Sequence, residues 1–289
     1  MTATDDVVDH YHRYGYVTVP GLLGAEDLGR LRDGTDRIAA QALGQTEDNG
    51  TFDFERGHTP ERPQIQRIKK PHRIDQLYVD MAAHAGILAI VGRLIGERIR
   101  LSHSKINMKA AALGAPLEWH QDWAFAPHTN MSTCVASVMI DDADLSNGAM
   151  QVLPGSHRGK LFDHHDEEQF FVGAIPADAP DLDLSNAAPL SGPAGTVAFH
   201  HPMTIHGSSA NRSGRPRRIL FLEYAAVDAF PLFYDVDWTE YNSRIVAGAP
   251  SSEVRFESNY VKLPFPSRVG FSIYKAQADA RNKFFETAT

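Results

Sequence analysis

Residues 118–123 place an imidazole and a carboxylate two positions apart, at His120 and Asp122. If this run is extended, side chains alternate between faces, so His120 and Asp122 point the same way and Gln121 points opposite. We expect the first two side chains to supply two ligands to one face of a metal ion, and His206 is the candidate for the third. Two His and one carboxylate leave the opposite face open, which suits non-haem Fe(II).

The His-x-Asp pattern alone is a weak signal. With fourteen His in the chain, it is expected about once by chance. A second copy is present at His164 and Asp166, in an acidic, turn-rich run that predicts a solvated loop. The assignment of the first copy therefore depends on the rest of the chain.

Residues 200–218 form the other segment whose side chains could bind a metal or a ligand. We expect a strand that ends at His206 to pass beside His120 and Asp122, and the chain then to turn and return along 218–225. On that return Arg217 would point into the same cavity as His206. A guanidinium pairs with a carboxylate through two hydrogen bonds, which suits a dicarboxylate co-substrate bound to the metal at its other end.

Length and composition exclude several classes of protein. The 289 residues suffice for one large core, and the 43% hydrophobic and 22% charged residues are typical of a globular protein. The formal net charge of −8 argues against partners that need a broad basic surface, namely nucleic acid and anionic membranes. Cys134 is the only cysteine, so multi-cysteine metal sites and internal disulfides are excluded, and we expect it in the core. No signal peptide or membrane-spanning run is predicted, which makes the cytoplasm the expected location.

The hydrophobic pattern divides the chain into three parts. Apolar periodicity predicts helices at 5–13, 25–43 and 74–95 and a strand at 15–20, and we expect a loop at 44–65. After residue 96, short runs with period two or with continuous β-branched character predict strands at 99–108, 118–125, 133–140, 149–153, 195–201 and 218–225. Many short strands favour an antiparallel sandwich or barrel. We expect one domain over 1–289, with a helical part to about 96, a β core over about 97–226 and a mixed part over 227–289.

Two further segments carry weaker expectations. Residues 159–190 are acidic and rich in turn formers, and a loop of that length inside a compact domain is usually functional or mobile, so we interpret it as a lid. A helix is expected over 273–285. His157, His200 and His201 are expected to be structural, since His near strand ends often bonds only to backbone.

Taken together, these ordered features resemble the phytanoyl-CoA dioxygenase (PhyH-like) family of Fe(II)/2-oxoglutarate oxygenases. The similarity covers roughly 7–225. It rests on His120-Gln121-Asp122, on Asn147-Gly148 with Val152-Leu153-Pro154-Gly155-Ser156-His157, on His206-Gly207-Ser208, Asn211 and Arg217, and on Gly15-Tyr16-Val17 after the opening helix. The fold that the resemblance implies is a double-stranded β-helix, a cupin-like jelly roll, mainly β with flanking helices.

The resemblance also implies roles for individual residues. His120, Asp122 and His206 match the iron ligands, Arg217 matches the arginine that grips the far carboxylate of 2-oxoglutarate, and Ser208 matches its hydroxyl partner. Further co-substrate contacts are implied at Gln121, Lys105 and Ser137, and an upstream basic contact at either Arg67 or Lys69.

The implied reaction is an oxidation by O₂ in which 2-oxoglutarate is converted to succinate and CO₂. Related halogenases lack the ligating carboxylate, so the presence of Asp122 predicts a hydroxylase. We expect a small or medium-sized organic metabolite as substrate, and the alternative is an acyl-CoA thioester. Two other readings stay open: a Zn²⁺ hydrolase, which leaves Arg217 unexplained, and a jelly roll that binds metal or ligand without turnover. The sequence does not indicate an oligomeric state.

Overall fold

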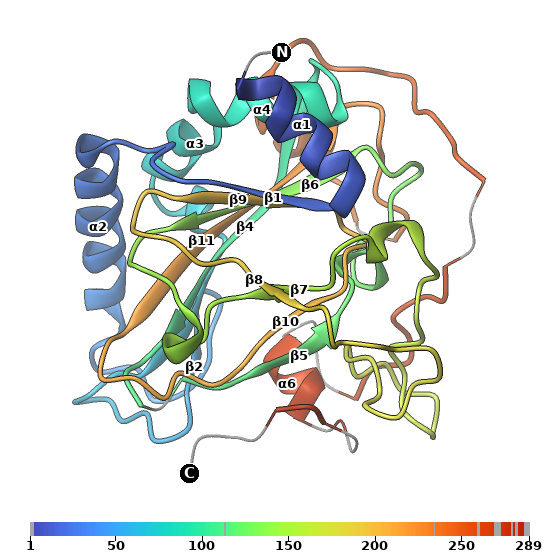
Figure 1. Cartoon of the computed structure of the whole chain (residues 1–289). Helices are drawn as coiled ribbons and strands as arrows, with labels where there is room; N and C mark the ends of the chain where they lie inside the picture. Colours follow the sequence, from blue (N-terminus) through green and yellow to red (C-terminus); the bar gives the residue numbers. More distant parts are fainter. Residues whose placement is uncertain are drawn as a thin grey trace.

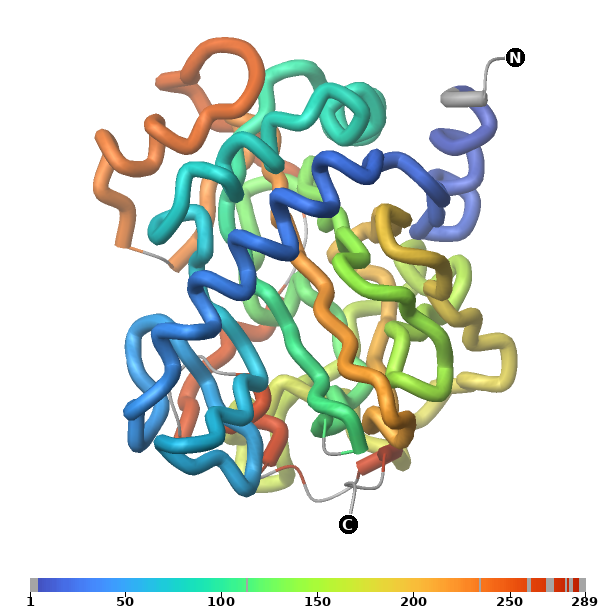
Figure 2. The backbone as a smooth tube through the Cα atoms, turned by 90° about the vertical axis from the view of Figure 1, so that its left-hand side faces the viewer, coloured from blue at the N-terminus to red at the C-terminus, as the bar shows by residue number. Residues whose placement is uncertain are grey.

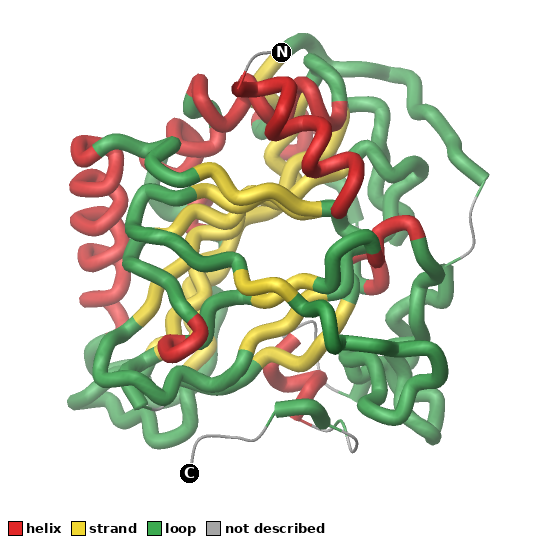
Figure 3. Tube along the Cα trace, viewed as in Figure 1, coloured by secondary structure: helices red, strands yellow, loops and turns green. Residues whose placement is uncertain are grey.

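The alternating runs after residue 96 form most of the strands of two antiparallel sheets that face each other (Figure 1, Figure 3). The structure is a computed structural model that describes residues 3–112, 114–233, 235–258, 261–268, 273–278, 280 and 283–285. The strands are β1 (Tyr16–Val19), β2 (Phe52–Phe54), β3 (Ile65–Lys69), β4 (Ile99–Lys109), β5 (Leu117–His120), β6 (Thr133–Met139), β7 (Gln151–Val152), β8 (Ala188–Pro189), β9 (Val197–His200), β10 (His206–Ser208), β11 (Arg217–Ala226) and β12 (Ile245–Ala247).

The larger sheet has the strand order β1-β9-β6-β11-β4-β3-β2, and β12 pairs with β4. The smaller sheet has the order β5-β10-β7-β8. Neighbours in each sheet are often far apart in sequence, as in β1 beside β9 and β10 beside β5. This topology confirms the predicted antiparallel β core and brings the two segments with candidate ligands together.

Strand β11 shows how the sequence builds two faces. Its side chains alternate, so Leu220 and Leu222 pack in the core under the helices, whereas Ile219 and Phe221 pack in the core between the sheets. Because both faces of the strand are covered, its apolar residues follow one another without the polar alternation of a half-exposed strand. Residues at odd positions of β11, including Arg217 at its start, therefore face the interior between the sheets.

The outer face of the larger sheet is covered by helices. Helices α2 (Ala25–Ala39), α3 (Leu77–Ala82) and α4 (Ala85–Ile95) lie over it, and α2 crosses the strands diagonally in Figure 2. Leu31, Ile38, Ile87 and Val91 are at most 2% exposed and belong to the core that includes these strands. Each such buried side chain contributes roughly 1.5–3 kcal/mol. The helices thus fix the larger sheet as a rigid wall of the site.

Several local expectations were wrong. The segment 44–65, expected to be a loop, contains β2, which pairs with β3. The helix expected over 74–95 is two helices, because His84 has non-helical backbone angles. The strand expected over 118–125 ends at His120, and Asp122 begins a short 3-10 helix (Asp122–Ala124). The strand expected over 149–153 is reduced to β7.

The remaining helices are α1 (Ala3–Tyr14), α5 (Trp238–Ser243) and α6 (Ile273–Ala278). Helix α6 packs against β5 at the edge of the smaller sheet (Figure 1). The helix expected over 273–285 is shorter than expected, because residues 280 and 283–285 are not helical, and positions 279, 281 and 282 lie outside the described residues. No helix in the described part of the chain is both long and apolar enough to cross a bilayer.

Candidate metal centre

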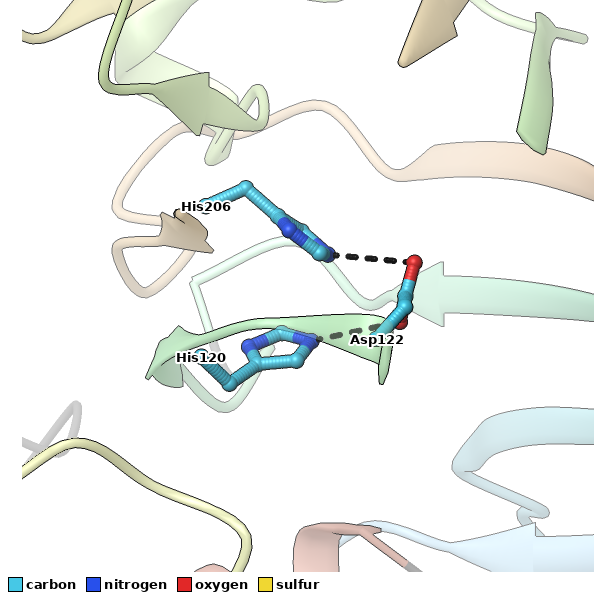
Figure 4. Close-up of side chains that lie close together, drawn as sticks. All are labelled: His120, Asp122 and His206. Carbon is cyan, nitrogen blue, oxygen red and sulfur yellow. Dashed lines mark ion pairs between the residues drawn. The ribbon is translucent and has the colours of Figure 1, made fainter. Parts of the chain in front are cut away.

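His120, Asp122 and His206 converge at one point between the sheets. Strands β5 and β10 run antiparallel with His120 and His206 as direct partners, and Asp122 lies just past the end of β5. One ligand atom from each residue lies within 4.8 Å of the others. Figure 4 shows both rings turned toward the carboxylate, with His120 Nε2 at 3.8 Å from Asp122 Oδ1 and His206 Nε2 at 3.7 Å from Oδ2. The predicted cluster is therefore formed.

The backbone fixes the tautomer of both imidazoles. Nδ1 of His120 lies 2.7 Å from the Glu118 carbonyl oxygen, and Nδ1 of His206 lies 2.9 Å from the Thr204 carbonyl oxygen. Because a carbonyl only accepts, each Nδ1 must carry the proton, which leaves the Nε2 lone pair directed into the cavity. Burial lowers the pKa of His120 well below its usual value and that of His206 to about 4, so both rings are neutral at physiological pH. Neutral imidazoles with free Nε2 atoms fit a bound cation.

The third ligand is held by a fourth residue, His200, at the end of β9. His200 Nε2 donates to Asp122 Oδ2 at 3.0 Å, and the His200 side chain is fully buried. Burial alone would raise the pKa of Asp122, but the imidazoles of His206 and His200 outweigh it and hold that pKa well below its usual range. His200, expected to be merely structural, thus contacts the candidate ligand directly, whereas His157 and His201 do not.

A cavity extends from the candidate metal ligands toward the start of β11. It is lined by Arg67, Lys105, Asn107, Leu117, His120, Asp122, Met150, His206, Gly207, Ser208, Arg217, Phe221, Ile273 and Tyr274. Arg217 is 3% exposed and donates from Nη2 to the Gly148 carbonyl oxygen at 3.0 Å. Its Nε has no hydrogen-bond partner among the described residues. Burial lowers its pKa to about 10, so the guanidinium is still charged at neutral pH and has a free donor for an anion.

Ser208 is supported by Lys109, which the sequence analysis missed. Lys109 is the cross-strand partner of Arg217, is 1% exposed, and donates from Nζ to Ser208 Oγ at 2.8 Å. While Lys109 is an ammonium it cannot accept a hydrogen bond, so in that state the Ser208 hydroxyl keeps its own proton for a ligand in the cavity. Burial also lowers the pKa of Lys109 well below its usual value. The available signal was the alternation of Lys105, Asn107 and Lys109 with Ile106 and Met108 at the end of the strand.

The structure distinguishes the two upstream basic candidates. Arg67 lines the cavity and donates from Nε to Asn107 Oδ1 at 3.1 Å, while its buried Nη2 has no partner among the described residues. Lys69 does not line the cavity and pairs with Asp53 Oδ1 at 2.9 Å, while Arg67 Nη1 lies 4.0 Å from Asp53 Oδ2. The Arg67 guanidinium lies over the ring of Tyr274, 4.9 Å from its centroid. Arg67 is therefore placed to meet an anion, and Lys69 is not.

The other expected co-substrate contacts are placed differently. Lys105 lines the cavity and pairs with Glu223 at 2.9 Å. Ser137 is buried on β6, and its hydroxyl has no partner among the described residues. Gln121 points away from the metal ligands, as the alternation predicts, and its carboxamide bonds the backbone of Lys160, Phe162 and Met203. The carboxamide of Gln121 is thus engaged by backbone partners, and its contact with a co-substrate stays a prediction.

The second His-x-Asp copy is not a solvated loop. His164 is 2% exposed, and its Nε2 accepts the Gln121 backbone N–H at 2.9 Å. The loop that carries His164 is therefore hydrogen-bonded to the segment that holds the candidate metal ligands.

Comparison with known proteins identifies the family. The family model described as "Phytanoyl-CoA dioxygenase (PhyH)" matches residues 11–219. A "Probable alpha-ketoglutarate-dependent hypophosphite dioxygenase" of Stutzerimonas stutzeri is 35% identical over 275 residues, covering 94% of this chain and 96% of that protein. An L-proline trans-4-hydroxylase of Streptomyces griseoviridis is 27% identical over 78% of this chain and 88% of its own length. The solved structure of EctD from S. alaskensis with 2-oxoglutarate and 5-hydroxyectoine matches with a TM-score of 0.66 at 22% identity, covering 89% of this chain and 87% of that chain, which shows a shared jelly-roll fold.

Proposed function

This chain belongs to the phytanoyl-CoA dioxygenase family and is an Fe(II)- and 2-oxoglutarate-dependent dioxygenase, and on that premise we propose which of its residues perform each task. His120, Asp122 and His206 hold the iron. The observation that carries this assignment is the convergence of their three ligand atoms within 4.8 Å. The fixed Nδ1–H tautomers support it, because they present two neutral Nε2 donors to the same point.

The bound iron, 2-oxoglutarate and O₂ supply the oxidising chemistry, in which 2-oxoglutarate gives succinate and CO₂ while the substrate is oxidised. The task of the chain is to bind and orient. Arg217 and Ser208 take the distal carboxylate, since both present donors into a cavity that also contains the iron ligands. Arg67 adds a second buried guanidinium. A Zn²⁺ hydrolase would leave both of these cations unexplained.

The substrate is a small molecule. Lys105 and Glu223, about one-fifth exposed each, place a polar ion pair near Asp122. The hypophosphite dioxygenase of S. stutzeri acts, by its name, on a very small anion, and it is similar over nearly the whole of this chain. Hypophosphite is therefore the first candidate substrate, followed by small organic metabolites, with acyl-CoA as the disfavoured alternative.

An anaerobic titration tests the co-substrate site. Fe(II) and 2-oxoglutarate are added to wild type, Arg217→Ala and Arg218→Ala, and the weak visible charge-transfer absorption of the complex is followed. Arg217→Ala should bind 2-oxoglutarate about 10- to 100-fold more weakly, as expected for loss of hydrogen bonds to a charged group. Arg218→Ala is the matched control, because its guanidinium pairs with Asp141 and Asp36 outside the cavity. Equal affinity of both variants would rule out Arg217 as the anchor.

A turnover screen then addresses the substrate. Succinate release is measured with hypophosphite, with small charged organic metabolites and with an acyl-CoA thioester. Release that depends on hypophosphite would support the first candidate. Release that depends only on acyl-CoA would contradict the proposal of a small substrate.

A further inference from the structure

Helix α6 contributes to the cavity although it lies outside residues 11–219, the part that the family model matches. Ile273 and Tyr274 of this helix line the cavity together with Arg67 and Arg217. We propose that α6 closes the 2-oxoglutarate pocket and that Tyr274 binds the distal carboxylate together with the two arginines. This inference rests on the proposed function, because it concerns the same co-substrate.

Tyr274 lines the same cavity as two incompletely paired cations, Arg67 and Arg217. The Arg67 guanidinium is held on one side by Asn107 and stacks on the Tyr274 ring, a cation–π contact that keeps its plane fixed. Arg67 Nη2 and Arg217 Nε remain without partners, although both residues are more than nine-tenths buried. Buried donors without acceptors are costly, so the cavity is prepared for an anionic ligand that can accept from both.

The Tyr274 side chain has the chemistry that such a ligand requires. Burial raises its pKa, although the positive charges of Arg67 and Arg217 oppose that effect, so the phenol stays protonated at neutral pH. A protonated phenol is a hydrogen-bond donor. Three donors of different geometry, two guanidinium groups and one hydroxyl, then surround a single carboxylate, which has about four lone-pair positions to receive them.

Helix α6 is also fastened to the strand that carries His120. The Gln277 carboxamide accepts the Glu118 backbone N–H at 2.9 Å and donates to the Gly173 carbonyl oxygen at 2.7 Å. The Glu118 carboxylate in turn accepts the backbone N–H of Phe284 at 2.8 Å. The C-terminal segment therefore contacts β5 at a residue two positions before an iron ligand. Closure over the pocket and the geometry of the metal strand are consequently linked.

Affinity measurements test the role of Tyr274. Tyr274→Phe, Tyr274→Ala and the control Lys275→Ala, an exposed neighbour that pairs with Asp48, are titrated anaerobically with Fe(II) alone and then with 2-oxoglutarate. Tyr274→Phe should weaken 2-oxoglutarate binding about 3- to 10-fold, the loss of one hydrogen bond, and Tyr274→Ala by about 10- to 100-fold, since the support of Arg67 is lost as well. Affinity for Fe(II) alone should not change in any variant.

Hydrogen–deuterium exchange gives a readout that does not need turnover. In the wild-type chain, amide exchange of residues 273–278 should slow at least several-fold when 2-oxoglutarate is added to the anaerobic Fe(II) protein. Unchanged exchange, or full 2-oxoglutarate affinity in both Tyr274 variants, would overturn the role of α6 while leaving the proposed function intact. A wild-type chain that does not bind 2-oxoglutarate at all would instead overturn the proposed function itself.

Discussion

The histidines of the two His-x-Asp copies are both buried, but only His120 has an Nε2 atom that no protein donor occupies. In the first copy, Nδ1 of His120 bonds a backbone carbonyl and Nε2 faces the cavity, where Asp122 lies. In the second, Nδ1 of His164 also bonds a backbone carbonyl, but its Nε2 accepts the Gln121 N–H. Asp166 pairs with Arg268 and accepts two backbone N–H groups of its own loop. The same residue types are thus a binding site in one place and a structural support in the other.

The difference shows that unused hydrogen-bonding capacity, rather than residue type, marks a metal site. A metal ion needs lone pairs that no protein donor has occupied. The second copy also supports the first, because His164 fixes the amide between His120 and Asp122. Substitutions in only one of the two copies therefore distinguish residues that bind the metal from residues that stabilise the metal-binding segment.

The largest effect is expected for Asp122→Ala compared with Asp166→Ala. Removing the only anionic ligand should lower Fe(II) affinity at least about 100-fold, more than the 10- to 100-fold typical of an outer-shell partner. Asp166→Ala should keep the iron affinity of the wild type and lower only the melting temperature, since it removes the partner of Arg268. Anaerobic titration with Fe(II) measures the first effect and thermal unfolding the second. Equal loss of iron in both variants would show that the comparison is wrong.

A smaller effect is expected for His200→Phe. His200 orients Asp122 through the 3.0 Å hydrogen bond from Nε2 to Oδ2, so its loss should lower Fe(II) affinity about 10- to 100-fold. His200→Gln retains a side-chain donor and should recover part of that affinity, which a purely structural role of the ring would not explain. His157→Ala is the control, because its ring bonds only the His12 carbonyl oxygen. Wild-type iron affinity in His200→Phe would rule out the orienting role.

Local patterns were sufficient to predict some features and not others. Short runs of β-forming residues between turn formers predicted β4, β6 and β11, because each of these strands is long and carries its pattern in its own residues. A strand at His206 that passes beside His120 was also predicted, but it was expected to end at His206, whereas β10 begins there. The segment after His120 was misread as a strand, because its turn depends on a hydrogen bond from the Trp123 N–H to the Pro202 carbonyl oxygen, about eighty residues away.

The contacts that were missed are all tertiary. His200 and His201 are adjacent in sequence, and only the pairing of β9 between β1 and β6 decides that His200 contacts Asp122. Tyr274 reaches the cavity because a distant helix packs on β5, and no spacing rule links it to Arg217. Free lone pairs and unpaired donors, which define the site, are not visible in a sequence at all.

The smallest effect is expected for the stabilisation that His164 provides, and it should appear as a loss of stability at acidic pH. His164 must keep its Nε2 lone pair to accept the Gln121 N–H, and burial lowers its pKa to about 4, below the ordinary value of about 6.5. Below pH 6.5 the unfolded chain therefore binds a proton at His164 more readily than the folded chain. The contribution of neutral His164 to the free energy of unfolding is thus complete above pH 6.5 and is lost as the pH falls toward 4. At pH 5 the loss amounts to on the order of 2 kcal/mol.

The variant His164→Phe isolates this contribution in denaturant unfolding of the metal-free protein. At pH 7.5 it should be less stable than the wild type by about 1–3 kcal/mol, because the Gln121 N–H loses its acceptor inside the protein. At pH 5 the difference should nearly vanish, since the wild type then carries the cost of keeping His164 neutral and the variant does not. Other buried imidazoles, such as His201, titrate in both proteins and cancel. A difference that is equal at both pH values would mean that His164 supports the metal strand by packing alone.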